Sequence, residues 1–94
     1  MNTTLNDIAA KLPQVAWQNP QTDNPVILTL VHDSRKVEPG TLFVCIPGAT
    51  VDGHDFAGEA IRKGAVAVLA EHPVADTGSA PVLLAPDVKT ALGS

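Results

Sequence analysis

The chain has little cysteine, few aromatic residues and little positive charge. Its 94 residues include one cysteine, one tryptophan, two phenylalanines and no tyrosine. A single cysteine cannot form an internal disulfide, so we expect a reducing, cytoplasmic location. Six Lys and Arg residues against ten Asp and Glu give a net charge of −4. No basic stripe is present that could displace counterions from a nucleic-acid backbone, so we expect no nucleic-acid partner.

Long apolar runs are also missing. No stretch approaches the roughly 20 apolar residues that a bilayer-spanning helix needs. The polar start MNTTLNDIAAKL lacks the apolar core of a signal peptide. We therefore expect no membrane partner. What remains is a globular composition, 45% hydrophobic and 17% charged, in a length that suits one small domain.

Apolar runs that alternate with turn signals predict an α/β fold. Thr4 to Asp7 fits a capping box for a first helix, which Pro13 ends. Asp52 can cap a second helix that runs to about Lys63. Apolar, largely β-branched runs predict strands at 26–31, 41–46, 65–70 and 81–85. Strand, helix and strand in close order form a parallel βαβ unit. We predict a small three-layer domain with a mostly parallel sheet of about four to five strands.

The two ends of this pattern carry further expectations. Trp17, next to the loop 18–25, is predicted to pack under the first helix. Asp87 looks like the N-cap of another helix, but the sequence stops within about two turns. A helix without a finished end indicates a piece cut from a longer protein; a short, frayed terminal helix is the alternative.

Most of the chemically distinctive residues lie in VHDSRKVEPGTLFVCIPGATVDGHDF, residues 31–56. His32, Asp33 and Ser34 include the residue types of a hydrolytic triad, but adjacent side chains point in different directions. Asp33 and Ser34 are therefore predicted to close a turn, and we expect no catalytic residue. His54 has no second His or Cys four residues later, and His32 and His72 could join it only through the fold. We expect no metal site. Cys45, inside an apolar run, is predicted to be a buried hydrophobe.

The turn at 32–36 and the loop at 47–53 both follow predicted strands. Ligands of open α/β sheets bind beyond the carboxyl ends of the strands. The N–H groups of Gly53 and His54, at the start of the second helix, offer a possible anion-binding site. Two acidic neighbours, Asp52 and Asp55, oppose an anion there unless they face away. Arg35 and Lys36 are either solvated charges or groups that face an anion. Neither a Walker motif nor G-x-G-x-x-G is present.

An ordered series of residues nevertheless resembles a known family. The series is Asp33-Ser34-Arg35, Val37, Gly40, Leu42-Phe43-Val44, Gly48, Asp52-Gly53-His54, Phe56, Ala60, Gly64-Ala65 and Ala67. It is similar to the N-terminal domain of Mur ligases of the MurE and MurF types, which extend the peptidoglycan stem peptide. The strings LFVCIPGATVDGHDF and AVLAEHP look more like MurE.

The resemblance implies a UDP-sugar-binding N-terminal domain over residues 1–94. Its substrate would be UDP-N-acetylmuramoyl-L-alanyl-D-glutamate, to which the complete ligase adds meso-diaminopimelate or L-lysine. ATP and Mg²⁺ would act in domains that this sequence lacks but that follow in cis, so no cofactor is expected here and the chain alone should be inactive. By their place in the motifs, the UDP-sugar contacts would be His32, Ser34, Ala49, Thr50 and Val51. Asp33 and Arg35 would build the turn that presents Ser34.

Two alternatives remain open. One is the same domain of a MurF-type ligase, which adds D-alanyl-D-alanine. The other is a non-catalytic α/β sensor module that uses a related scaffold.

Overall fold

A computed structural model of the protein describes residues 3–19, 23–47 and 52–88. Its centre is a sheet in the order β2-β7-β6-β5-β4. The strands are β2 (Ala16–Trp17), β4 (Thr29–Val31), β5 (Thr41–Val44), β6 (Ala65–Ala70) and β7 (Val82–Leu84). The pairs β4–β5, β5–β6 and β6–β7 are parallel, and β2 joins β7 antiparallel. The predicted, mostly parallel sheet is confirmed.

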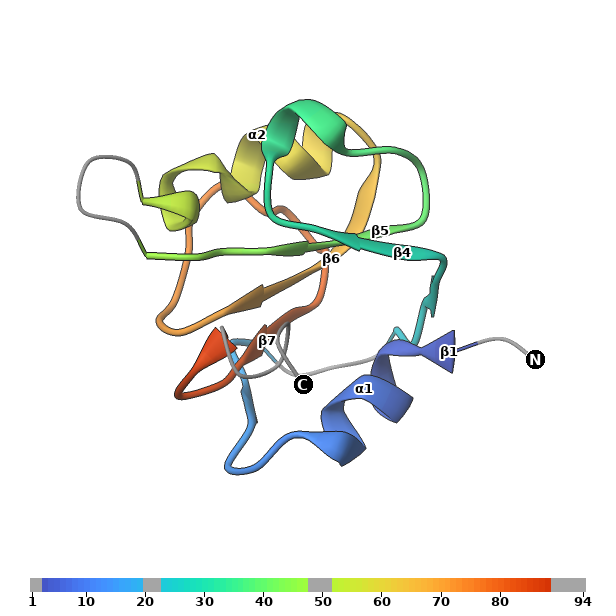
Figure 1. Ribbon diagram of the computed structural model, residues 1–94, viewed down its shortest axis with the longest axis vertical. Coiled ribbons are helices and arrows are strands. Elements are labelled where there is room, and N and C mark those ends of the chain that lie inside the picture. The colour runs from blue at the N-terminus through green and yellow to red at the C-terminus, as the bar shows by residue number, and fades with distance from the viewer. Residues whose placement is uncertain (1–2, 20–22, 48–51, 89–94) are drawn as a thin grey trace.

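Helices lie on both faces of this sheet (Figure 1). α1 (Leu5–Lys11) covers one face, and α2 (Ala57–Arg62) covers the other together with the short 3-10 helix η2 (Gly53–Phe56). Successive side chains of a strand point to opposite faces. Accordingly, Leu42 and Val44 of β5 join the core cluster under α1, whereas Phe43 and Cys45 join the cluster under α2. The three-layer arrangement and the βαβ unit β5–α2–β6 are therefore confirmed.

The predicted helix start is confirmed in detail. Thr4 Oγ1 accepts the Asp7 N–H at 3.3 Å, and the Asp7 carboxylate accepts the Thr4 N–H at 2.9 Å, as a capping box requires. The first buried residue of the helix, Leu5, belongs to the cluster against which Trp17 packs. Trp17 lies in β2, a two-residue strand. The sequence did not predict this strand, because its surroundings are polar and rich in proline.

The prediction of a single strand at residues 26–31 is wrong. It is two strands, β3 (Val26–Ile27) and β4. β3 pairs antiparallel with β1 (Thr3–Thr4) in a separate two-stranded sheet. Leu28 stands between the two strands and donates its N–H to Gly40 O at 2.9 Å. The apolar run thus serves two sheets, which periodicity along the chain cannot distinguish.

Two further expectations concern the ends and the membrane. The helix expected from Asp87 lies almost wholly outside the described residues; within them, Val88 is fully buried. None of the helices in the described ranges has the length and apolar character that a membrane crossing demands.

Cys45 is a buried hydrophobe, as predicted, with no exposed surface. Burial, and secondly the charge of Asp52, raise the pKa of its thiol from 9.0 to about 12. At pH 8 this shift leaves roughly a thousandfold less thiolate, which is the reactive form. We expect a thiol reagent such as Ellman's reagent to label Cys45 only after denaturant is added. The absorbance of the released thiol measures the rate, and labelling of the folded chain as fast as that of the unfolded chain would contradict the burial.

Candidate functional site

A cavity of about 570 Å³ lies where two loops leave the sheet. β4 and β5 are parallel neighbours, so their carboxyl ends reach the same rim. Residues 32–36 follow β4, and the chain from residue 45 to 53 follows β5. The cavity is lined by His32, Asp33, Ser34, Arg35, Phe43, Ile46, Pro47, Gly53, Phe56 and Glu59. The structure thus brings His32, Ser34 and Gly53 to one cavity; Ala49, Thr50 and Val51 lie outside the described residues.

The turn after β4 is built by Asp33 and Arg35. Asp33 Oδ1 accepts the backbone N–H of Arg35 at 2.9 Å and caps the 3-10 helix η1 (Ser34–Lys36). The Arg35 guanidinium also donates to both carboxylate oxygens, at 3.0 and 2.8 Å. These side-chain bonds, followed by the backbone bond, hold the pKa of Asp33 far below its usual range. The turn-building role expected of this pair is therefore confirmed.

Ser34 is presented by this turn. It is half-buried, and no group in the described part of the chain bonds to its hydroxyl. Its carbonyl oxygen accepts from Lys63 Nζ at 3.3 Å. A hydroxyl without a partner at a cavity wall can donate to, or accept from, a bound molecule. His32 is exposed at the same wall.

The second wall is fixed by hydrogen bonds at the start of η2. Gly53 N–H donates to Ile46 O at 2.9 Å, His54 N–H donates to Asp52 Oδ1 at 2.9 Å, and Asp55 N–H donates to Asp52 O at 3.0 Å. All three N–H groups are used inside the chain. The anion site predicted on Gly53 and His54 would need these same donors, which are bonded to Ile46 O and Asp52 Oδ1.

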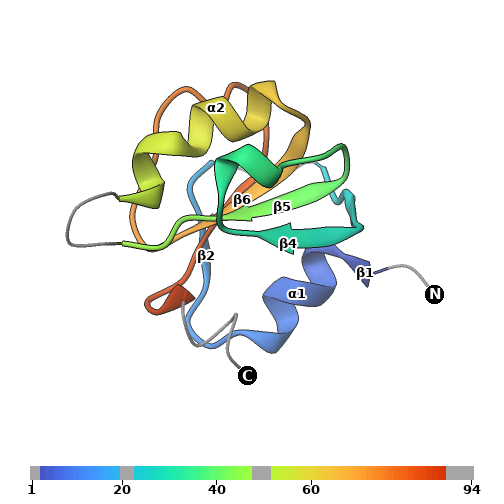
Figure 2. The same ribbon diagram turned by 45° about the horizontal axis from the view of Figure 1, so that its top comes forward.

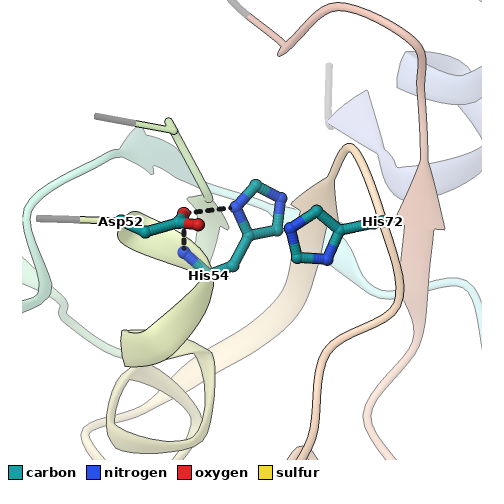
Figure 3. A group of neighbouring side chains, drawn as sticks. All are labelled: Asp52, His54 and His72. Carbon is teal, nitrogen blue, oxygen red and sulfur yellow. Dashed lines mark hydrogen bonds and ion pairs between the residues drawn. The ribbon is translucent and has the colours of Figure 1, made fainter. Parts of the chain in front are cut away.

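A cluster of Asp52, His54 and His72 adjoins this wall (Figure 3). Their candidate metal-ligand atoms lie within 4.8 Å of one another. Both ring nitrogens of His54 are already bonded, however: Nδ1 lies 2.6 Å from Asp52 Oδ1, and Nε2 accepts the Glu71 N–H at 3.0 Å. The two imidazoles stack at 3.8 Å with an interplanar angle of 15°. Imidazole binds metals through an in-plane nitrogen lone pair, so stacked rings do not converge on one ion.

The cluster is therefore a hydrogen-bonded and stacked group, without the geometry of a metal centre. The backbone N–H of His54, followed by its ring, lowers the pKa of the Asp52 carboxyl. The sequence left open whether His72 meets His54, because their meeting depends on how α2 and β6 return the chain to this rim. The order DGHDF before the helix and AVLAEHP after it was the only signal.

Comparison with known proteins decides the family. The family model described as "Mur ligase family, catalytic domain" matches residues 26–91. The chain belongs to the Mur ligase family.

Individual Mur ligases match most of this chain. The UDP-N-acetylmuramoyl-L-alanyl-D-glutamate–2,6-diaminopimelate ligase of Geobacillus thermodenitrificans is 51% identical over 88 residues, which are 94% of this chain and 17% of that protein. The ligase of the same name from Listeria monocytogenes is 43% identical over the same shares. The crystal structure of MurF from Acinetobacter baumannii matches this chain with a TM-score of 0.79 at 27% identity. The match covers 99% of this chain and 20% of the MurF chain. The chain thus spans about a fifth of the length of these relatives.

Proposed function

We propose that this chain is the N-terminal, UDP-sugar-binding domain of a MurE-type ligase. It would hold the UDP end of UDP-N-acetylmuramoyl-L-alanyl-D-glutamate in the cytoplasm. The matching ligases from Geobacillus thermodenitrificans and Listeria monocytogenes are named for 2,6-diaminopimelate, which favours that amino acid over L-lysine as the third residue of the stem peptide. The proposal covers residues 1–94 as one domain.

The cavity between the Ser34 turn and Gly53 carries this proposal. It lies beyond the carboxyl ends of two adjacent parallel strands, where open α/β sheets bind ligands. Its volume of about 570 Å³ falls within the range of about 300–1,000 Å³ usual for small-molecule sites. It also joins His32 and Ser34, two of the residues that the family motif assigns to the UDP-sugar. Ala49, Thr50 and Val51 remain proposed contacts.

The chemistry would take place in other domains of the complete enzyme. ATP and Mg²⁺ would serve there to activate the glutamate carboxylate, which the amino group of the incoming amino acid then attacks. Holding the UDP end far from the reacting carbonyl supplies binding energy and positions the substrate. We therefore expect neither ATP hydrolysis nor ligase turnover from this chain alone.

The two alternatives fit less well. A MurF-type ligase is supported by likeness to solved MurF structures, at 27% identity for the one from Acinetobacter baumannii and 38% over 66% of this chain for the one from Thermotoga maritima. The ligase from Geobacillus, at 51%, is named for diaminopimelate addition. A sensor module without ligase domains is not favoured by the relatives that match most of this chain, because they are named as ligases.

Titration of the ¹⁵N-labelled chain with UDP tests the proposal. UDP has about 25 heavy atoms, and about −0.3 kcal/mol per atom sets a ceiling near −7 kcal/mol. Because the domain encloses only part of the nucleotide, we expect a Kd between roughly 10 μM and 1 mM. The amides of Ser34, Ile46 and Gly53 should shift. Shifts confined to the opposite cavity, around Asn24 and Ser79, would place the nucleotide elsewhere.

The Ser34 hydroxyl should contribute directly to this affinity. Ser34→Ala removes one hydrogen bond, worth about 1 kcal/mol, and should raise the Kd for UDP about fivefold. Ser79→Ala is the matched control, because Ser79 is an exposed serine that lines the other cavity. Isothermal titration calorimetry measures both. Equal Kd values for wild type and Ser34→Ala would exclude the hydroxyl as a contact.

A further inference from the structure

The imidazole ring of His54 lies buried and fully hydrogen-bonded beside the proposed nucleotide site. Its side chain is only 3% exposed, and both ring nitrogens are bonded within the chain. Because a backbone N–H can only donate, Nε2 must accept from Glu71 and carry no proton. The proton of the neutral ring therefore resides on Nδ1 and is donated to Asp52 Oδ1. Such a fixed tautomer gives the ring one orientation.

The two partners of His54 belong to different parts of the molecule. Asp52 is the N-cap of η2 and immediately precedes Gly53 in the cavity wall. Glu71 follows the last residue of β6, and its carboxylate accepts the Val88 N–H at 3.1 Å. Val88 is fully buried in the core under α1. Glu71 is thus held to the core, and His54 connects it to the cavity wall. Figure 3 shows the His54 ring bonded to Asp52, and Figure 2 shows α1 and α2 on opposite sides of the sheet.

We propose that His54 is a positioning residue for the nucleotide cavity. Its neutral, Nδ1-protonated ring joins Asp52 to Glu71 and so fixes the Gly53 wall opposite the Ser34 turn. The inference rests on the proposed function, because it concerns the affinity of that same cavity for the nucleotide. A pre-formed wall lowers the ordering cost of binding, so a broken link reduces affinity without removing any ligand contact.

His72 has a different part in this group. It stacks on the His54 ring, and its Nδ1 lies 3.1 Å from Pro73 O. It is exposed and makes no hydrogen bond to Asp52 or Glu71 among the described residues. Loss of His72 therefore removes a stacking partner and leaves both bonds of the link in place.

Two substitutions break the link at different bonds. The terminal amide of glutamine in His54→Gln lies near the position of Nε2 and can accept from Glu71, but it does not reach Asp52. The shorter amide in His54→Asn lies near the position of Nδ1 and can donate to Asp52, but it does not reach Glu71. We expect each variant to raise the Kd for UDP-N-acetylglucosamine about tenfold. His72→Gln is the matched control and should stay within about twofold of wild type.

The measurements separate positioning from stability. Calorimetry is carried out at a temperature where the NMR spectrum shows each variant folded, because a role in stability alone leaves the Kd of the folded population unchanged. In the wild type, the His54 Nδ1–H resonance should also shift as the nucleotide saturates the cavity. An unchanged Kd in both variants, or an unmoved Nδ1–H resonance at saturation, overturns the positioning role while the proposed function stands. A wild-type chain that binds neither UDP nor UDP-N-acetylglucosamine overturns the proposed function and this inference together.

Discussion

Leu83→Ala should leave the domain close to unfolding at 37 °C. Leu83 of β7 is fully buried and belongs to the core cluster under α1. Truncation of a buried leucine to alanine costs about 2–5 kcal/mol, because the transfer free energy is lost and a cavity remains. The free energy of unfolding of a domain is only about 5–15 kcal/mol, and a chain of this size belongs near the lower end.

Denaturant unfolding followed by tryptophan fluorescence measures the loss in free energy of unfolding. Trp17 is a suitable probe because it pairs with Leu83 across β2 and β7. The melting temperature should fall by at least about 10 °C. Leu28→Ala is the matched control: Leu28 is 71% exposed, so its truncation should change stability by no more than about 0.5 kcal/mol. Equal effects of the two substitutions would show that β7 does not lie in the core.

The sequence predicted best those elements whose signals are local. β6 occupies the predicted residues 65–70, and the Thr4 capping box closes as predicted. In both cases, neighbouring residues contain all the information, namely an apolar run with turn signals or a side chain three residues from its partner. The N-cap of the second helical segment, Asp52, follows the same logic: its side chain accepts the His54 N–H.

Elements defined by distant partners could not be predicted in this way. β2 is two residues long, and only its pairing with β7 makes Ala16 and Trp17 a strand. The run 26–31 divides because β1 takes Val26 and Ile27 into a second sheet, whereas β5 takes residues 29–31. Such partners are chosen by tertiary packing, which outweighs local preference in strands.

The same distinction holds for the site. The meeting of Ser34 and Gly53 at one rim follows from a topological rule, since loops after adjacent parallel strands share an edge. The use of the N–H groups at residues 53–55 inside the chain follows from no such rule. It depends on Ile46 and Asp52 turning back as acceptors. The strand topology therefore predicts where the cavity lies. Which N–H groups remain free to bind a ligand there follows only from the three-dimensional structure.

Gly53→Ala should weaken nucleotide binding strongly. A Cβ at this position would lie 2.7 Å from Ile46 N and 3.1 Å from Ile46 O. Both are backbone atoms, so no side-chain rotation can relieve the contact. The loop must move away, and the bond from Gly53 N–H to Ile46 O at 2.9 Å is lost. Overpacking of this kind costs about 1–3 kcal/mol of stability.

Because Gly53 forms the cavity wall itself, we expect the Kd for UDP to rise more than about tenfold. Gly58→Ala is the control for binding: its Cβ would lie 2.7 Å from Asp76 Cβ, outside the lining of the nucleotide cavity. It should lower the melting temperature and leave the Kd unchanged. Gly78→Ala has no atom within 4 Å of the new Cβ and a φ of +60°; it isolates the cost of left-handed backbone, about 1 kcal/mol. Equal Kd values of Gly53→Ala and Gly58→Ala for UDP would contradict the proposed site. They would show that displacing the Gly53 loop removes no contact with UDP, so that the nucleotide does not lie against this wall.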